Sequence, residues 1–352
     1  MSTQTTDEII DALLARFERA AQHVGSRDVD LVVAGHAVRL RFAGDGSVDS
    51  VLPALAHLVA PAHARVDLTV HVWDTQTTSV GVIPAPWDMT QLAVGGTIPQ
   101  AIAQGLYATY DIARERLVVL DPGRGLAFVW IRDPSQVARH ERAAPLRGLF
   151  AAYFGARGLV ITHAGAVARG GRGVLLGGRG GSGKSSTALA CLAAGFDYAG
   201  DDYVLTEPDA AGGPRVHSLY ATGKVFPADT GRLAEIQPAF AGRDGPGLAP
   251  DDKAIAYLHG SVPERMSRGF ALVALLMPTV TGLPHTRVVP MSSAHALRAL
   301  APSTIVQYDG APAPLFAALA RLVARLPCHR LELGTERHAI PGVVARVIET
   351  GA

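Results

Sequence analysis

Cysteine is scarce in this sequence, and long hydrophobic runs are absent. Two cysteines, Cys191 and Cys328, do not make the disulfide scaffold of a small secreted domain. The longest strongly apolar run, 270–277, is far shorter than the roughly 20 residues that a membrane-spanning helix needs. The segment 1–10 contains acids where a signal peptide has bases. We therefore expect a cytoplasmic protein.

An excess of either charge is missing as well, since 32 basic residues face 31 acidic ones and the net charge is +1. A protein that coats nucleic acid or binds an anionic membrane has a clear basic excess. We therefore expect neither nucleic acid nor a membrane among the partners. The hydrophobic content of 48% allows a large folded core.

Lysine is rare among the basic residues. Only Lys184, Lys224 and Lys253 are lysines, and the other 29 basic residues are arginines. Lysine has a compact charge on a flexible stem, whereas arginine presents a wide planar fork. A lysine retained in such a chain is therefore a candidate for a task that arginine cannot perform.

A length of 352 residues fits one large or two medium domains. We expect an α/β protein, α+β overall, with an N-terminal α+β domain over 1–140 and a second domain over 141–352. No catalytic motif is found in the first domain. Its hydrophobic spacing predicts helices at 5–24 and 51–59, and an antiparallel sheet of strands at 31–42 (a hairpin that turns near Gly35), 66–73, 106–112, 116–120 and 126–132.

The pattern changes near residue 140, where predicted helices and strands begin to alternate. Loops rich in Gly, Pro and Asp are expected at 207–215 and 241–252. The predicted helices are 146–156, 184–194, 294–301, 314–326 and one from 341, and the predicted strands are 159–168, 173–176, 198–205, 216–220, 271–277, 286–289 and 329–333.

The segment Gly178–Ser185 fits the pattern G-x-x-x-x-G-K-[ST] at every fixed position, between a predicted strand and a predicted helix. Its glycines let backbone N–H groups turn toward a phosphate, and the helix directs its positive end at the same anion. This pattern predicts binding of ATP, or another nucleoside triphosphate, with Mg²⁺. The expected binding residues are Gly178, Gly180, Gly181, Ser182, Gly183, Lys184, Ser185 and Ser186.

Asp201 and Asp202 follow this loop at the start of a predicted apolar strand. One such carboxylate can hold Mg²⁺, and the other can accept the proton of an incoming hydroxyl. Acidic residues in a solvated turn are the simpler alternative. His163 lies upstream within the predicted strand 159–168, where it could tune Asp201, although a strand histidine is often a core residue.

Together, Ile161-Thr162-His163-Ala164, Gly178–Ser185 and Gly200-Asp201-Asp202 resemble the HPr serine kinase/phosphorylase family in residues and spacing. The resemblance covers about residues 146–350. It implies a P-loop kinase domain with a fold related to PEP carboxykinase. It further implies that Asp201 is the base for a serine hydroxyl and that His163 interacts with Asp201. Asp202 would hold Mg²⁺ together with Ser185.

The C-terminal part resembles a separate branch of that family. The segments 216–224, 252–254, 301–304 and 327–334 are similar to HPr-kinase-like proteins of ribosomal-peptide pathways, among them lasso-peptide tailoring kinases. Those kinases phosphorylate a serine of a precursor peptide. The acidic signature motif of the bifunctional HPr enzymes is not found after Asp202. In addition to the catalytic Lys184, Lys224 or Lys253 could supply a further catalytic cation for the transferring phosphoryl group, although either could be an ordinary surface lysine.

We therefore expect a kinase for a serine of a peptide or small protein, with the N-terminal domain recognising the acceptor. A small-molecule acceptor, a nucleotide-binding regulator without an acceptor, phosphorylase activity and a homo-oligomer remain open. Cys191 and Cys328-His329 are expected to pack in the core, because no second ligand pair lies at metal-binding spacing. Ser303-Thr304 is a helix-start or loop feature that could also touch substrate.

Overall fold

The computed structural model describes residues 5–82, 87–88, 91–226, 236, 239, 253–307 and 312–351. The predicted loop 241–252 and Asp252 of the C-terminal segments lie outside the described residues. The chain divides into two compact units. The first contains Met1–Pro53 and Leu58–Ala156, and the second contains Ala54–His57 and Arg157–Ala352.

The division falls between Ala156 and Arg157, later than the expected 140/141. Helix α6 (Arg147–Gly155) stays with the first unit because it packs against β5 (Arg116–Asp121) and the Tyr153 hydroxyl donates to the Asp67 carbonyl over 3.1 Å. A four-residue segment from the N-terminal half belongs instead to the second unit.

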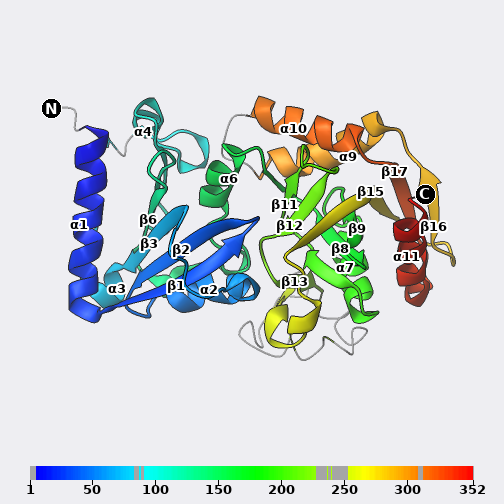
Figure 1. Ribbon diagram of the computed structural model, residues 1–352, viewed down its shortest axis with the longest axis horizontal. Coiled ribbons are helices and arrows are strands. Elements are labelled where there is room, and N and C mark those ends of the chain that lie inside the picture. The colour runs from blue at the N-terminus through cyan, green and yellow to red at the C-terminus, as the bar shows by residue number, and fades with distance from the viewer. Residues whose placement is uncertain are drawn as a thin grey trace. The chain divides into compact units, whose positions relative to one another are not determined.

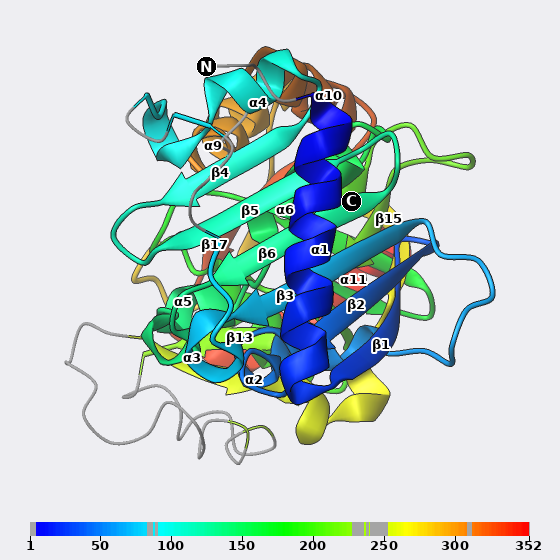
Figure 2. The same ribbon diagram turned by 90° about the vertical axis from the view of Figure 1, so that its left-hand side faces the viewer.

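The first unit is built on one sheet, in the order β1-β2-β3-β6-β5-β4 among the described residues. Figure 2 shows α1 (Thr6–Val24) lying across this sheet. The buried side of α1, including Leu13 and Phe17, packs against Trp73 of β3. The other strands are β1 (Ser26–Val33), β2 (His36–Ala43), β3 (Leu68–Asp74), β4 (Tyr107–Asp111) and β6 (Leu126–Ile131).

This sheet is mixed, so the expectation of an antiparallel sheet is wrong. β1 and β2 form the predicted hairpin, but β2–β3 and β3–β6 are parallel pairs. The reason is the connection through α2 (Val48–Leu55), which carries the chain across so that β3 runs in the direction of β2. The short helices α3 (Thr75–Thr78), α4 (Pro99–Ala103) and α5 (Arg139–Arg142) complete the unit.

The second unit contains a larger mixed sheet. In the part of the chain that the structure describes, its strand order is β10-β8-β9-β15-β12-β11-β7, with β17 on β15 and β16 on β17. These strands are β7 (Val160–Thr162), β8 (Gly165–Arg169), β9 (Arg172–Leu176), β10 (Asp197–Gly200), β11 (Val204–Glu207), β12 (Arg215–Ser218), β15 (Gly269–Val280), β16 (Arg287–Pro290) and β17 (Cys328–Leu333). A separate pair joins β13 (Thr222–Val225) to β14 (Ala254–Tyr257).

Helices cover both faces of the larger sheet (Figure 1). On one face, Val174 of β9 packs with α7 (Lys184–Ala193) and α11 (Ile340–Thr350). On the other, Leu175 packs with α9 (Ser293–Ile305) and α10 (Pro312–Ala324). This alternation is the period of two that a strand buried on both faces requires. Cys191 and Cys328 are buried on opposite faces, which confirms that both pack in the core.

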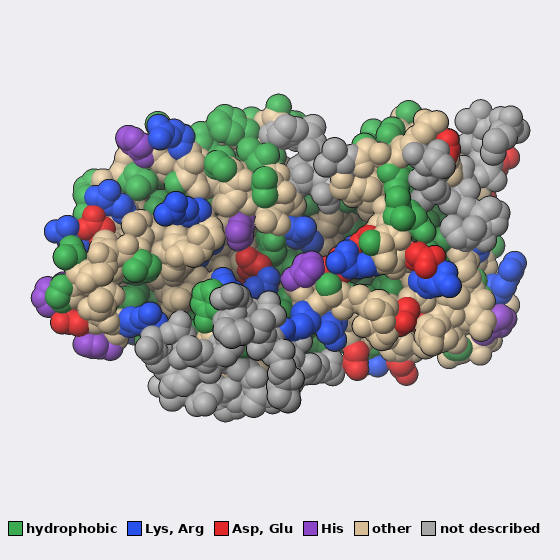
Figure 3. All heavy atoms as spheres, turned by 180° about the vertical axis from the view of Figure 1, so that it is seen from behind, with side chains coloured by type: hydrophobic (Ala, Val, Ile, Leu, Met, Phe, Trp, Pro, Cys, Tyr) green, Lys and Arg blue, Asp and Glu red, His purple; other side chains and the backbone are tan. Residues whose placement is uncertain are grey.

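Figure 3 shows one face of the molecule, on which Asp and Glu side chains are scattered among Lys and Arg side chains. No single-sign patch dominates that view, in keeping with the net charge of +1. Among the described residues, no helix combines the length and the apolar character that crossing a bilayer requires.

Candidate functional site

Two of the predicted strands are each broken in two, and the candidate residues lie at the breaks. The predicted strand 159–168 is β7 and β8, with His163 between them, and the predicted strand 198–205 is β10 and β11, with Asp201 and Asp202 between them. β7 pairs with β11, whereas β8 pairs with β10, both antiparallel. The two breaks therefore face each other, and His163 is at a bend, not inside a strand as predicted.

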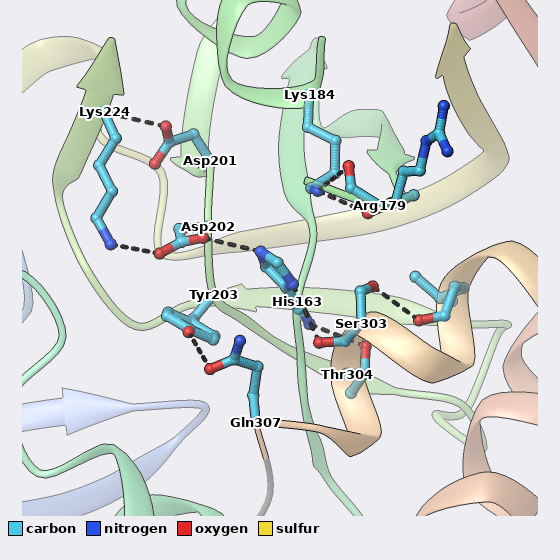
Figure 4. Close-up of polar contacts among 12 residues, drawn as sticks. His163, Arg179, Lys184, Asp201, Asp202, Tyr203, Lys224, Ser303, Thr304 and Gln307 are labelled. Carbon is cyan, nitrogen blue, oxygen red and sulfur yellow. Dashed lines mark hydrogen bonds and ion pairs between the residues drawn. The ribbon is translucent and has the colours of Figure 1, made fainter. Parts of the chain in front are cut away.

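Asp202 is bonded through both carboxylate oxygens (Figure 4). The Nε2 atom of His163 lies 3.0 Å from Oδ1, and Nζ of Lys224 lies 2.5 Å from Oδ2. The family resemblance implied a contact between His163 and Asp201, and the structure has the contact to Asp202 in its place. The cause is the antiparallel register across the two breaks, which also stacks the His163 ring on Tyr203 at 5.5 Å between centroids.

The other side of His163 is held by the last turn of α9. Its Nδ1 atom lies 3.1 Å from the Ser303 carbonyl, and its backbone N–H donates to Oγ1 of Thr304 over 3.2 Å. A carbonyl only accepts, so Nδ1 must carry a hydrogen. Nε2 faces the Asp202 carboxylate, so both ring nitrogens of His163 lie against hydrogen-bond acceptors.

Asp201 has a different environment from its neighbour. It is 1% exposed, its Oδ2 accepts the backbone N–H of Lys224 over 3.0 Å, and its Oδ1 has no hydrogen-bond partner among the described residues. Burial and the charge of Asp202 raise the pKa of Asp201 to about 6, although the Lys224 N–H and the Ser185 hydroxyl act in the opposite direction.

Burial would raise the pKa of Asp202 too, but the hydrogen bond from His163 and the charge of Lys224 outweigh it and hold that pKa well below its usual range. The Lys224 pKa is raised, since Asp202 outweighs the effect of burial on the ammonium group. The charge of Asp202 is therefore compensated within the protein, whereas the buried charge of Asp201 is compensated only in part.

The phosphate loop connects the end of β9 to α7, as predicted. Gly178 and Gly183 have φ values of +126° and +105°, which favour glycine, and a Cβ at Gly183 would lie 2.3 Å from Cδ1 of Leu333. The ammonium of Lys184 donates to the carbonyls of Gly178 (2.6 Å) and Arg179 (3.1 Å). Lys184 is 6% exposed, and burial lowers its pKa.

The remaining loop residues leave room for a phosphate. A Cβ at Gly180 or Gly181 would meet nothing within 4 Å, and the hydroxyl of Ser182 is buried without a hydrogen-bond partner. Ser185 and Ser186 lie in the first turn of α7, where backbone N–H groups are unpaired.

These residues fit a nucleoside triphosphate with Mg²⁺. The loop N–H groups and Lys184 match the phosphates. Mg²⁺ usually takes one or two protein oxygens together with phosphate oxygens and waters, and the unpartnered Oδ1 of Asp201 with the nearby Ser185 hydroxyl is such a set.

The sequence singled out Ser303-Thr304 as a feature that could touch substrate, but it did not reveal their contacts to His163 or the role of Gln307. Ser303 and Thr304 lie in the last turn of that helix, not at its start. Gln307 accepts a hydrogen bond from the Tyr203 hydroxyl over 3.0 Å, and Nζ of Lys224 lies 5.9 Å from the centre of the Tyr203 ring. The similarity of segment 301–304 to other kinases was the available signal.

No family model matches the chain, and no curated protein matches it. Among solved structures, the Hpr(Ser) kinase/phosphatase from Coxiella burnetii is similar, with 11% sequence identity and a TM-score of 0.29. The match covers 54% of this chain and 93% of that chain. Because the TM-score is low, we base nothing on this likeness.

Proposed function

We propose that this protein is an ATP- and Mg²⁺-dependent kinase of the HPr-kinase-like type, which transfers the γ-phosphate to a serine hydroxyl of a peptide or small protein. A ribosomally made precursor peptide, of the lasso type, is the acceptor that we favour. The observation that carries the proposal is the meeting of three groups in one place. These are the phosphate loop with Lys184, the buried carboxylate of Asp201, and Asp202 between His163 and Lys224.

Phosphoryl transfer requires positioning and charge neutralisation more than covalent chemistry. Lys184 and the loop N–H groups bind the β- and γ-phosphates. Lys224 supplies a further positive charge, and His163 a further polar group, near the carboxylate pair. When bound, Mg²⁺ neutralises phosphate oxygens, and Ser185 with a carboxylate of the pair would hold it. The second carboxylate orients the acceptor hydroxyl and receives its proton.

The peptide acceptor is supported by the similarity of the C-terminal segments to peptide-tailoring kinases. Two of those segments contain residues that reach the site, since Lys224 bonds Asp202 and Ser303-Thr304 hold His163. The first unit has no catalytic motif of its own, and we propose that it recognises the acceptor.

The test is intact-mass analysis after incubation of the protein with ATP and Mg²⁺. Three reactions run in parallel, with short peptides encoded next to this gene, with free serine, and with no added acceptor. A peptide that gains the mass of a phosphoryl group supports the proposal, and fragmentation identifies the modified residue. Phosphate on free serine alone would establish a small-molecule kinase, and nucleotide binding with no transfer would indicate a regulator.

Two variants distinguish a specific loss of nucleotide binding from a general loss of folding. Lys184→Ala should abolish transfer and weaken ATP binding, because it removes the ammonium that contacts the phosphates. Arg298→Ala removes a positive charge from an exposed position of α9 and should leave both unchanged. Full transfer by Lys184→Ala would contradict the assignment of the phosphate loop.

A further inference from the structure

We infer that the two adjacent aspartates have the roles opposite to those of the resembling family: Asp201 is the metal carboxylate, and Asp202 is the carboxylate that meets the acceptor hydroxyl. This inference rests on the proposed function for its catalytic half. The metal half requires only that the phosphate loop binds nucleotide.

Accessibility is the first observation. An acceptor hydroxyl must approach its base to within hydrogen-bond distance, about 3 Å. Asp201 is 1% exposed, behind the strand break, whereas the side chain of Asp202 is 20% exposed. Figure 4 shows Asp202 between Lys224 and His163, with Asp201 displaced toward the backbone of Lys224. Asp202 is therefore the more exposed of the two carboxylates and the one that an acceptor hydroxyl meets first.

Charge is the second observation. Asp202 already has a partner on each oxygen, the His163 imidazole at 3.0 Å and the Lys224 ammonium at 2.5 Å. Asp201 has one neutral backbone donor on Oδ2, and its Oδ1 is buried without a hydrogen-bond partner among the described residues. A buried carboxylate oxygen without a partner is costly, and a divalent cation would compensate it. Of the two carboxylates, Asp201 is therefore the one whose charge still requires a cation.

Position along the chain is the third observation. Asp201 directly follows β10, and the Ser185 hydroxyl of the loop is among the groups that lower the pKa of its carboxyl. In P-loop enzymes, Mg²⁺ is held by the loop Ser or Thr and by an aspartate that follows a strand. Asp201 and Ser185 together match that donor pair, while both oxygens of Asp202 point to Lys224 and His163.

Phosphoryl transfer is a single displacement at the γ-phosphorus. The acceptor oxygen forms a bond to the γ-phosphorus as the bond from that phosphorus to the β,γ-bridging oxygen breaks. The electron pair of the broken bond leaves with ADP. The hydroxyl proton passes to Asp202, whose oxygens each keep one lone pair after bonding His163 and Lys224. Asp202 later returns that proton to water.

The deciding experiment measures Mn²⁺ binding to the full-length protein with ADP, by electron paramagnetic resonance, so that it is independent of turnover. Asp201→Asn and Ser185→Ala should each weaken Mn²⁺ binding by about tenfold or more, whereas Asp202→Asn should stay within about twofold of the parent. In the same preparations, Asp202→Asn should lower single-turnover transfer of the γ-phosphoryl group of ATP, to the acceptor identified by mass analysis or to water, by about a hundredfold. Metal-free ADP binding and thermal unfolding check that each variant is folded.

Loss of Mn²⁺ binding in Asp202→Asn with retention in Asp201→Asn would overturn the inference. Equal losses of Mn²⁺ binding in both variants, or no loss in either, would also overturn it. If Asp201→Asn does not fold, full Mn²⁺ affinity in Asp202→Asn together with loss in Ser185→Ala still excludes Asp202 as the metal carboxylate. Parental transfer by Asp202→Asn would overturn its catalytic role. A parent that binds Mn²⁺ through Asp201 but transfers phosphate to no acceptor would contradict the proposed function and leave the metal assignment standing.

Discussion

Nε2 of His163 lies 3.0 Å from Oδ1 of Asp202, across two strand breaks that face each other. The same imidazole is held on its far side by the carbonyl of Ser303. Three separate parts of the chain therefore determine the position of one ring. This arrangement keeps Asp202 ionised and holds its partners His163 and Lys224 in place, and it predicts how substitutions at each member will differ.

His163→Gln and His163→Asn form a matched pair. The Gln amide can occupy the position of Nε2 and keep a hydrogen bond to Asp202, whereas the Asn amide can replace only the Nδ1 contact to Ser303. We expect transfer to fall about tenfold in the Gln variant and about a hundredfold in the Asn variant, with ATP affinity little changed in both. Single-turnover rates and ATP titrations measure the two quantities. Equal losses in the two variants would show that the Asp202 contact is not the important one.

Lys224→Met removes the ammonium that lies 2.5 Å from Oδ2 of Asp202. Both side chains are mostly buried, with 16% and 20% exposure, so the remaining charge of Asp202 loses a partner that water replaces only in part. We expect the free energy of unfolding to fall by about 1–3 kcal/mol, as measured by urea denaturation. Met keeps the packing of the lysine stem, and Asp202→Asn in the same background should restore part of the loss. No recovery in the double variant would argue against this origin of the effect.

Lys224→Arg tests whether the shape of the cation matters. The guanidinium keeps the charge but is a wide planar fork. The group that now lies between Asp202 and the Tyr203 ring is a compact ammonium, so the two shapes differ. We expect lower transfer with a smaller loss of stability than in Lys224→Met. Wild-type transfer by Lys224→Arg would show that any cation suffices and that the scarcity of lysine is not informative here.

The pH dependence of stability should contain a contribution from His57. Burial, with the charges of His259 and Arg268, lowers the His57 pKa to about 3, whereas an unfolded histidine has a pKa of about 6.5. Between these values the unfolded chain takes up a proton that the folded chain does not. Stability from this group is therefore present above about pH 6.5 and is lost as the pH falls toward 3, by up to about 1.4 kcal/mol per pH unit.

His57→Gln is the variant that tests this contribution. The Gln amide can keep the contact that Nε2 of His57 makes to Oγ of Ser218 at 2.7 Å, but it does not titrate. The free energy of unfolding, measured by urea denaturation at a series of pH values, should depend less steeply on pH in the variant. Parallel curves for the variant and the parent between about pH 4 and pH 6 would contradict the prediction.

A fragment that begins at residue 157 should be less stable than the second unit within the full chain. It lacks Ala54–His57, whose Ala54 carbonyl accepts from Ala221 over 2.8 Å and whose His57 bonds Ser218. Ser218 also donates to the Ala199 carbonyl, just before the carboxylate pair. We expect a loss of about 2–3 kcal/mol and weaker ADP binding, and a peptide of residues 48–60 added in trans should restore part of both. A fragment as stable as the full chain would show that the segment is dispensable.

Local sequence was sufficient for the phosphate loop. Its glycines, lysine and serine stand at the required spacing between a strand and a helix, and the observed α7 begins at Lys184 as predicted. The conformation depends on residues within the loop, above all on positive φ at Gly178 and Gly183. Most helices were predictable for the same reason, because an amphipathic pattern such as that of α1 is complete within the segment.

The breaks at His163 and Asp201 could not be predicted in this way. Apolar residues lie on both sides of His163 and of Asp201-Asp202, so each segment resembles one strand, and the chain leaves it because its two halves pair with different partners. Pairing depends on residues far apart in the chain, as does the parallel β2–β3 register. Burial and charge at Asp201 and Asp202 follow from that pairing. The residue types thus specified the chemistry available to this protein, while long-range strand pairing chose which aspartate contacts His163, because neighbours in sequence can have opposite environments in a folded core.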